Sequence, residues 1–271
     1  MILKYNQIVV NLQKKQRMSH QETKGFVDVL IENKIATITF YHPASNSFPS
    51  SLLQQMVLKI NQLSVNDAVS VIVLQSENEV FCAGASFDEL LAVSNTKEGT
   101  TFFSGFANVI NAMRKCPKLI IGRVQGKAVG GGVGIIAACD YVVATETSAL
   151  KLSEIAIGIG PFVIEPAITR KIGVVGFSDM SLSPTQWKSA DWALQKGLFS
   201  KVVATIDQLN DEINQKAVEM ASYNPASLVE IKKVFWQNTD HWDDLLLERA
   251  GISGALVLSD FTKKALEAFK K

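Results

Sequence analysis

The chain has 271 residues, of which 47% are hydrophobic and 20% charged, a composition typical of a globular protein and not of a disordered one. Its formal net charge is +1 and no apolar run is long enough to span a membrane, so we expect neither nucleic acid nor a membrane among its partners. The 3 cysteines and 3 histidines show no metal-ligand spacing, which predicts a cytoplasmic protein with reduced thiols and no metal site.

The first elements expected along the chain are an extension, a hairpin and a helix. Residues 1–20 interrupt their short apolar runs with polar residues and show no small-residue cleavage site, so we expect a flexible extension. Two β-rich runs, Phe26–Ile31 and Ile35–Tyr41, are separated by three polar residues, which predicts a β-hairpin. Residues 50–64 place apolar side chains at helical spacing after a serine-rich start that suits a helix cap.

A strand, a small-residue turn and a helix then occur in this order twice. The first turn is Cys82–Ser86, which lies between an apolar strand and a helix that Ser86 or Asp88 is suited to cap. The second turn is the glycine run Gly130–Gly132, which lies between a strand at 118–126 and a helix of small residues. Both turns place unhindered backbone N–H groups beside a helix N-terminus, where developing negative charge is stabilised.

The pattern changes near residue 206, because the remaining sequence is largely helical. Asn224 followed by Pro225 is a typical helix start, with the Asn side chain as the cap and Pro at the first helical position. We therefore divide the chain into an extension at residues 1–20, a core at residues 21–205 and a helical region at residues 206–271.

The glycine run does not fit a nucleotide-binding motif well. The phosphate-binding pattern GxxxxGK[ST] is absent, and only the permissive dinucleotide pattern that ends in alanine fits, as Gly132, Gly134 and Ala137. Two interpretations remain for the run taken alone. Its glycines permit either a close approach of the backbone to a ligand or tight packing of a helix on a strand.

Four sequence blocks together resemble the crotonase (enoyl-CoA hydratase/isomerase) superfamily. They are, in order, FYHPASN at 40–46, VFCAGASFDEL at 80–90, the stretch from IGRVQGKAVGGGVG to GIGP at 121–161, and SPTQWKSADWALQKGLFSKVV at 183–203. The resemblance implies an α/β fold of the crotonase-like (ClpP/crotonase) type, a spiral of repeated ββα units with a C-terminal α-helical region that mediates trimerisation. It also implies a homo-oligomer, either a trimer or a hexamer.

The resemblance further implies an oxyanion hole for the carbonyl oxygen of an acyl thioester. Its two donors would be the backbone N–H groups of Ala85 and Gly131, and each preorganised donor of this kind contributes about 3 kcal/mol to stabilising an enolate-like transition state. Coenzyme A is then expected only as part of the substrate, with no separate cofactor. The further residues expected to contact the substrate are Ala83, Gly84, Gly130, Gly132 and Phe162.

The acid and base groups depart from the hydratase pattern of this superfamily. Hydratases typically carry one Glu two residues after the glycine run and another in a later ExxxG segment, and these positions are Gly134 and Glu154 here. The absence of the first carboxylate argues against simple hydration of an enoyl thioester. Glu154 is therefore the predicted proton carrier. Glu165 is a second catalytic candidate, although its place before Pro166 also suits a helix cap.

The sequence thus predicts a hydratase/isomerase-type enzyme that acts on an enoyl or 3-hydroxyacyl thioester, with one glutamate that moves the proton. A dehydratase or decarboxylase of a β-branched acyl thioester, methylglutaconyl-like and carried by CoA or a carrier protein, stays open as an alternative, as does a non-catalytic thioester-binding member. Family members contact CoA of a neighbouring subunit through the last helix, where this chain has Phe261, Lys263 and Lys264. A solvated amphipathic helix is the alternative interpretation of these three residues.

Overall fold

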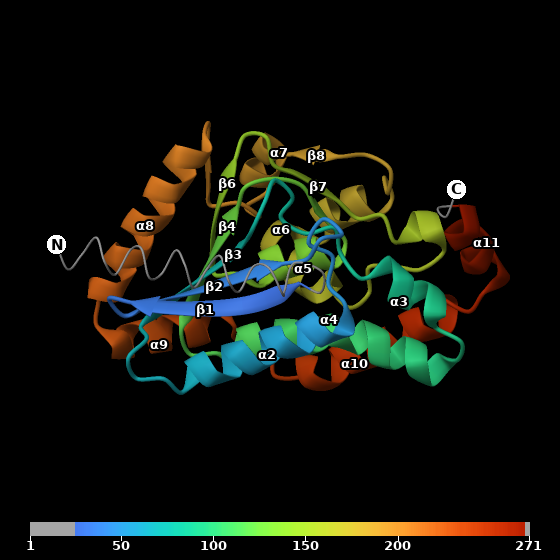
Figure 1. The fold of residues 1–271 in the computed structure, drawn as a ribbon, viewed down its shortest axis with the longest axis horizontal. Helices are drawn as coiled ribbons and strands as arrows, with labels where there is room; N and C mark the ends of the chain where they lie inside the picture. Colours follow the sequence, from blue (N-terminus) through green and yellow to red (C-terminus); the bar gives the residue numbers. More distant parts are fainter. Residues whose placement is uncertain (1–24, 269–271) are drawn as a thin grey trace.

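The computed structural model describes residues 25–268, so the extension expected at residues 1–20 lies outside the described part. Within the described residues, the main sheet has 6 strands whose spatial order follows the chain (Figure 1). The first two strands are antiparallel and every later neighbouring pair is parallel, so the chain advances in one direction across the sheet. The strands are β1 (Phe26–Glu32), β2 (Ile35–Tyr41), β3 (Val71–Ser76), β4 (Leu119–Val124), β6 (Tyr141–Thr145) and β9 (Lys201–Val203).

The predicted hairpin is confirmed as β1 and β2. Their register runs from the pair Phe26–Tyr41 to the pair Glu32–Ile35. Asn33 and Lys34 connect the strands with φ values of 50° and 66°, the left-handed pair that a tight two-residue hairpin turn requires. The first strand is one residue longer than expected, because Glu32 pairs within the ladder instead of lying in the turn.

Helices connect the parallel strands and cover the sheet. The second half of the chain ends in helices, as predicted, and Asn224 caps one of them by accepting from the Ala226 N–H at 3.0 Å. The helices are α2 (Ser50–Ser64), α3 (Phe87–Ala92), α4 (Thr96–Lys115), α5 (Gly131–Ala138), α6 (Glu165–Ser181), α7 (Ala190–Gln195), α8 (Ile206–Ser222), α9 (Pro225–Phe235), α10 (Trp242–Leu256) and α11 (Asp260–Ala268), with a short 3-10 helix η1 (Ile155–Ile157).

The start of α2 differs from the serine cap that its sequence suggests. Its N-cap residue is Pro49, whose side chain makes no capping bond. The carboxylate of Glu89, on α3, instead accepts from the Ser50 N–H at 2.9 Å and from the Ser50 hydroxyl. An anion at a helix N-terminus is stabilised by the free N–H groups there, so a residue distant in sequence takes the role of the local cap.

A second, smaller sheet joins the central loops. It consists of β5 (Ala128–Val129), β7 (Ala149–Lys151) and β8 (Lys188–Ser189), and single bridges extend it from Ala128 to Cys82 and from Ala85 to Phe48. These short pairings bring loops from four crossovers side by side.

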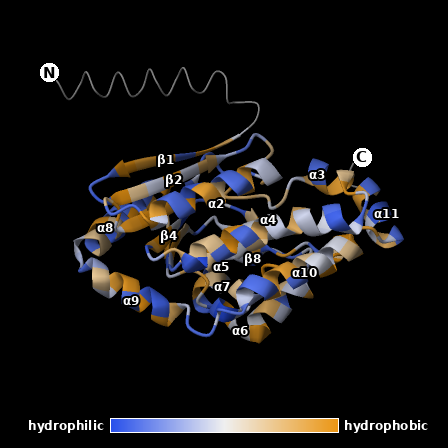
Figure 2. Ribbon diagram, turned by 90° about the horizontal axis from the view of Figure 1, so that it is seen from below, coloured by the Kyte–Doolittle hydropathy of each residue, from blue (hydrophilic) through white to orange (hydrophobic). Residues whose placement is uncertain are grey.

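The helical region packs on both sides of the core instead of standing apart from it. Helix α8 buries Leu209, Ile213 and Ala217 against β3, β4 and β6, whereas Leu246 and Ala250 of α10 belong to the main core on the other side. The main sheet is therefore covered on both faces, and α8 and α9 each show a hydrophobic and a hydrophilic side (Figure 2). Within residues 25–268, no helix combines the length and hydropathy that a transmembrane span needs.

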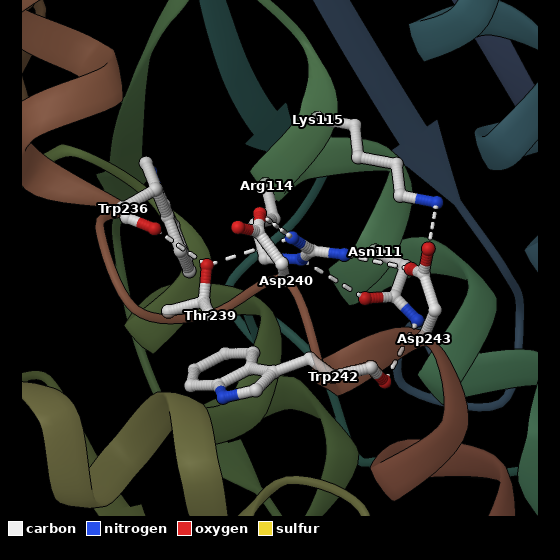
Figure 3. Close-up of polar contacts among 8 residues, drawn as sticks. All are labelled: Asn111, Arg114, Lys115, Trp236, Thr239, Asp240, Trp242 and Asp243. Atoms are coloured by element: carbon white, nitrogen blue, oxygen red, sulfur yellow. Dashed lines mark hydrogen bonds and ion pairs between the residues drawn. The ribbon is translucent and has the colours of Figure 1, made fainter.

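Helix α10 is fastened to the end of α4 by a buried arginine. The Arg114 guanidinium donates to Asp243 at 2.7 Å and lies 3.9 Å from Asp240, while its side chain is only 6% exposed (Figure 3). The Asn111 amide adds a hydrogen bond of 3.4 Å to the backbone carbonyl of Trp242. Because a buried cation is costly without partners, these contacts fix where α10 begins along α4.

Candidate active site

The first predicted turn is held so that one backbone N–H group is free of the sheet. Phe48 accepts from the Ser86 N–H at 3.1 Å and donates to the Gly84 carbonyl at 2.8 Å. Alternate residues of an extended chain face opposite sides, so the N–H of Ala85 between them faces away from Phe48. Ser86 then starts α3 as its N-cap, accepting from the Glu89 N–H at 3.4 Å, which confirms the predicted cap.

The second predicted turn places the glycine run at the start of α5. Gly130 donates to the Lys151 carbonyl at 2.9 Å and adopts φ 54° and ψ −120°, a conformation that only glycine takes without strain. Gly131 is the first residue of α5, where backbone N–H groups have no partner inside the helix. Among residues 25–268, neither the Ala85 N–H nor the Gly131 N–H has a hydrogen-bond acceptor.

The two turns lie against each other. A Cβ atom placed on Gly84 would lie 3.1 Å from the carbonyl oxygen of Val129 and 3.9 Å from the nitrogen of Gly131. Gly84 also has a φ of 93°, so both its conformation and its surroundings exclude a side chain. The structure therefore brings the N–H groups of two distant motifs to the same small region of backbone.

Glu154 reaches this region from the residue before η1. A Cβ atom placed on Gly130 would lie 2.7 Å from Glu154 Oε1, so the carboxyl group rests on the bare backbone of the glycine run. Its other oxygen, Oε2, is buried and has no hydrogen-bond partner among the described residues. Burial disfavours the charged form and raises the pKa of Glu154 to about 7, against the weaker lowering effect of a backbone hydrogen bond.

Ala85, Gly131 and Glu154 line one cavity of about 150 Å³. The predicted contact residues Ala83, Gly84 and Gly130 line it as well. Glu154 is the only charged side chain among its lining residues in the described part of the chain. The opposite wall is apolar and comes from α4 and the segment before α6; its main side chains are Phe102, Phe103, Phe106, Ile159, Val163 and Ile164.

Ile164 fills the space beside Gly134, the position where the hydratase pattern has its first glutamate. A Cβ atom placed on Gly134 would overlap the Ile164 side chain, with the Ile164 Cβ only 2.7 Å away. Gly134 is buried and has no room for a side chain of any length. The absence of a second carboxylate is thus built into the packing of α5 against the start of α6.

Three other predicted residues do not line the cavity. Gly132 packs against Cys82: a Cβ atom placed on Gly132 would lie 2.7 Å from the Cβ of Cys82. Phe162 packs its ring over Gly160 and is not among the lining residues, whereas its neighbour Val163 is. Glu165 begins α6, accepts from the Thr169 hydroxyl at 2.7 Å and lies 3.8 Å from Arg249 of α10.

The last helix also lies outside the cavity lining. Helix α11 packs on η1, where a Cβ atom placed on Gly158 would lie 2.6 Å from the ring of Phe261. Phe261 is nevertheless 65% exposed, and Lys263 and Lys264 are exposed as well. Their predicted contact with CoA of a neighbouring subunit stays a prediction.

A larger hollow of about 630 Å³ lies between α6 and the α9–α10 connection. Its charged groups already have partners: Asp140 pairs with Lys232 at 3.0 Å and accepts from the Trp236 indole at 2.8 Å, and Arg170 stacks 4.1 Å from the same ring. Asp140 also accepts from the Ile120 N–H at 2.8 Å, which confirms that it ties down its loop. These contacts hold helices together, so we place the active site in the smaller cavity.

The sequence did not predict two serines of the cavity lining, Ser153, which precedes Glu154, and Ser253, on α10. Ser253 is the more buried of the two. It is 1% exposed and lines the cavity, and its hydroxyl has no hydrogen-bond partner among the described residues. A lone serine in a helical sequence carries no signal of this kind, because its place depends on how α10 lies along α4. Within residues 25–268, no group of three or more His, Cys, Asp or Glu side chains is arranged to hold a metal ion.

Comparisons with known proteins agree with the resemblance in the sequence. Residues 30–267 match the family model described as enoyl-CoA hydratase/isomerase. The chain is 28% identical to the bacillaene synthase dehydratase PksH of Bacillus subtilis, over 79% of this chain and 82% of that protein. It is 31% identical to the short-chain-enoyl-CoA hydratase of Clostridium acetobutylicum, over 70% of this chain and 74% of that protein.

The fold is also that of solved structures. An enoyl-CoA hydratase from Bacillus halodurans superimposes with a TM-score of 0.84 at 20% identity, over 90% of this chain and 99% of that one. This likeness confirms the predicted crotonase-like α/β fold. The match of the family model over most of the sequence, together with the shared fold, shows that this chain is an enzyme of the enoyl-CoA hydratase/isomerase family.

Proposed function

We propose that this enzyme moves a proton along the acyl chain of a short enoyl thioester and thereby shifts its double bond. The observation that carries the proposal is that the cavity has one buried carboxylate, Glu154, while Ile164 fills the space beside Gly134 where a second one would stand. Hydration in this family's two-carboxylate pattern needs a second glutamate at the position that Ile164 closes. A single carboxylate beside two free N–H groups suffices for proton transfer next to a thioester.

In the proposed reaction, the thioester oxygen accepts hydrogen bonds from the N–H groups of Ala85 and Gly131. Glu154 removes a proton from the carbon next to the thioester of a 3-enoyl substrate, and the electron pair delocalises into a dienolate whose oxygen the two donors stabilise. Glu154 then returns the proton to the fourth carbon, which leaves a 2-enoyl thioester. No atom is gained or lost and no oxidant is consumed.

The protonation behaviour of Glu154 suits both halves of this cycle. A pKa of about 7 leaves comparable amounts of the charged and neutral forms near neutral pH. The group is then basic enough to accept a proton from carbon and acidic enough to return it. An ordinary exposed glutamate, ionised throughout this range, is a weaker base and returns a proton less readily.

The size of the cavity supports a short acyl chain. A volume of about 150 Å³ corresponds to a benzene-sized molecule in other apolar protein cavities. We propose that coenzyme A or a carrier-protein arm arrives as part of the substrate and that no other cofactor takes part. The proposal includes a homo-oligomer, a trimer or hexamer, as the working assembly.

Dehydration of a 3-hydroxyacyl thioester is the second candidate. The identity with the dehydratase PksH over 79% of this chain supports it. Glu154 would remove the same proton and then protonate the departing hydroxyl group, which leaves as water. Decarboxylation is less well supported, because no described lining residue carries a positive charge to bind a second carboxylate.

The test is a panel of short 3-enoyl, 2-enoyl and 3-hydroxyacyl CoA thioesters, assayed by mass spectrometry in D2O. We expect Glu154→Gln to lower the rate of conversion about 100- to 10,000-fold, while acyl-CoA binding stays within a few-fold of the wild type. Glu165→Gln is the matched control, because this carboxylate lies outside the cavity lining, and its rate is expected to stay close to that of the wild type.

Full activity of the Glu154→Gln variant, or an equal loss in the Glu165→Gln variant, would overturn the assignment of Glu154. Deuterium incorporation with 3-enoyl thioesters alone supports isomerisation, whereas loss of water from 3-hydroxyacyl thioesters supports the second candidate. Tight binding with no conversion of any thioester would support the non-catalytic alternative.

A further inference from the structure

Two of the buried polar atoms without partners in the described chain lie on the same cavity. One is Oε2 of Glu154, and the other is the hydroxyl of Ser253, on α10. The third such atom, the Ser181 hydroxyl on α6, is not part of the cavity lining. A buried hydroxyl without a hydrogen bond costs about 1–3 kcal/mol, so the Ser253 side chain needs a physical explanation.

Ser253 differs from four other hydroxyl groups on helices of the described chain. Thr100, Thr101 and Ser104 on α4 each donate to the carbonyl four residues earlier, at 2.9, 2.9 and 2.7 Å. Ser64 on α2 makes the same bond at 2.8 Å. The carbonyl four residues earlier is a common hydrogen-bond acceptor for a hydroxyl group inside a helix. The Ser253 hydroxyl does not make it and lines the cavity instead.

The packing of α10 brings Ser253 to the cavity. A Cβ atom placed on Gly99 of α4 would lie 2.7 Å from the carbonyl oxygen of Gly254 and 2.8 Å from its Cα, so the two helix backbones touch. Arg114 and Asp243 hold the other end of the same helix pair (Figure 3). With contacts at both ends, α10 keeps its position along α4, and Ser253 stays at the cavity wall.

The surroundings indicate what the hydroxyl binds. The described lining contains no Lys, Arg or His; its polar side chains are Ser153, Glu154 and Ser253, and the carboxyl of Glu154 is its one charged group. Arg249, one turn earlier on α10, lies beside Glu165 at 3.8 Å. A ligand carboxylate would therefore enter without a cation to pair with it, which is costly. A ligand hydroxyl is uncharged and can either donate to the Ser253 hydroxyl or accept from it, so it pairs with Ser253 without bringing a second charge into the cavity.

We propose that Ser253 is a specificity-determining residue that hydrogen-bonds to a hydroxyl group on the acyl chain of the substrate. The inference rests on the second candidate under the proposed function, dehydration of a 3-hydroxyacyl thioester, which likewise places the thioester at Ala85 and Gly131 and directs the acyl chain into the cavity. Ser253 favours hydroxyacyl thioesters over unsubstituted ones of the same length. It binds the substrate and takes no part in proton transfer.

The experiment compares the binding of 3-hydroxybutyryl-CoA and butyryl-CoA by calorimetry in the Glu154→Gln background, where conversion is suppressed. We expect Ser253→Ala to weaken the binding of 3-hydroxybutyryl-CoA about five- to tenfold, with less than a twofold change for butyryl-CoA. Ser181→Ala removes the buried, unpartnered hydroxyl outside the cavity, so it is the matched control and is expected to change neither affinity.

An equal loss of affinity for both thioesters would show a packing role for Ser253, and no loss for either would show that its hydroxyl does not contact the acyl chain. Both results overturn the inference. The melting temperature without ligand is a second check: we expect no decrease in Ser253→Ala, because no hydrogen bond within the described chain is lost. If neither thioester binds to any variant, the proposed function fails, and the inference fails with it.

Discussion

The cavity has two walls of different physical kinds. One wall consists of backbone, where Ala85 and Gly131 present N–H groups that the short pairings of the small sheet hold in place. The other wall consists of side chains from α4, from the segment before α6 and from α10, among them Phe106, Ile164 and Ser253. The backbone wall has almost no freedom to vary, because Gly84 and Gly130 have no room for a side chain. Residues of the side-chain wall can be substituted wherever the neighbouring side chains can repack around the new one.

This difference separates the proposed chemistry from the proposed selectivity. Donors to a thioester oxygen need an exact position and no particular side chain, so a glycine-rich backbone suits them. Selection among acyl groups needs shape and a few polar groups, which side chains supply. Changes in the backbone wall should therefore abolish turnover, and changes in the side-chain wall should alter stability or substrate preference.

The largest expected effect comes from the backbone wall. Gly130→Ala places a methyl group 2.7 Å from Glu154 Oε1 in a conformation that alanine resists, so it displaces the carboxyl group. We expect kcat to fall about 100-fold or more. Gly173→Ala is the control, since Gly173 also has a positive φ of 70° but a Cβ atom there meets nothing within 4 Å. Equal losses in steady-state assays of both variants would assign the effect to backbone strain alone.

A smaller effect concerns stability and its dependence on pH. The pKa of Glu154 is about 7 in the folded chain and near 4.5 as an ordinary glutamate, so between these values the folded state holds a proton that the unfolded state releases. Stability contributed by this group is therefore complete below about pH 4.5 and is lost as pH rises to about 7. We expect Glu154→Gln to raise the free energy of unfolding by about 3 kcal/mol at pH 8.

Urea denaturation at two pH values tests this prediction. The gain of the Glu154→Gln variant should be present at pH 8 and absent near pH 4.5. A gain of the same size at both values would show that it comes from packing or hydrogen bonding and not from the buried charge.

The smallest expected effect concerns the packing of the side-chain wall. Gly134→Ala forces a methyl group against Ile164 and should lower the free energy of unfolding by about 1–3 kcal/mol. In an Ile164→Ala background the same substitution should cost about 1 kcal/mol less, because part of the obstructing side chain is gone. Urea denaturation of the four proteins measures this coupling, and strict additivity would contradict the packing explanation.

Gly251→Ala is the control for this pair of substitutions. Gly251 lies in α10, and a Cβ atom placed there meets nothing within 4 Å. Because alanine is the better helix former, this variant should be more stable than the wild type by up to about 1 kcal/mol.

Much of the fold and of the backbone wall was predictable from local sequence. Alternating apolar runs, two small-residue turns and the helical end of the chain are patterns among neighbours, and they led to the hairpin and the crossovers. The proximity of Ala85 to Gly131 was implied by the resemblance to the superfamily. The spacing of the ExxxG segment pointed to Glu154. The turns were predictable because close backbone approach requires glycine or alanine, and that requirement is visible at each position. The catalytic role of Glu154 stays a prediction.

The side-chain wall was not predictable in the same way. Phe162 was expected at the cavity, but its ring packs over Gly160 and Val163 lines the cavity instead. Neighbouring residues at an irregular segment differ in direction, and direction depends on the backbone path before α6. Glu165, a catalytic candidate in the sequence, contacts Thr169 and Arg249 and does not line the cavity.

The amino-acid sequence determined the family, the two small-residue turns and the loss of the first carboxylate at Gly134. Only the tertiary structure decided that Ile164 closes the space beside Gly134, that burial raises the pKa of Glu154 to about 7, and that Ser253 lines the cavity. The physical reason is the distance along the chain over which each effect acts. Conformational requirements of the backbone act within a few residues, whereas burial, desolvation and packing depend on segments that are distant in the chain and meet only after folding.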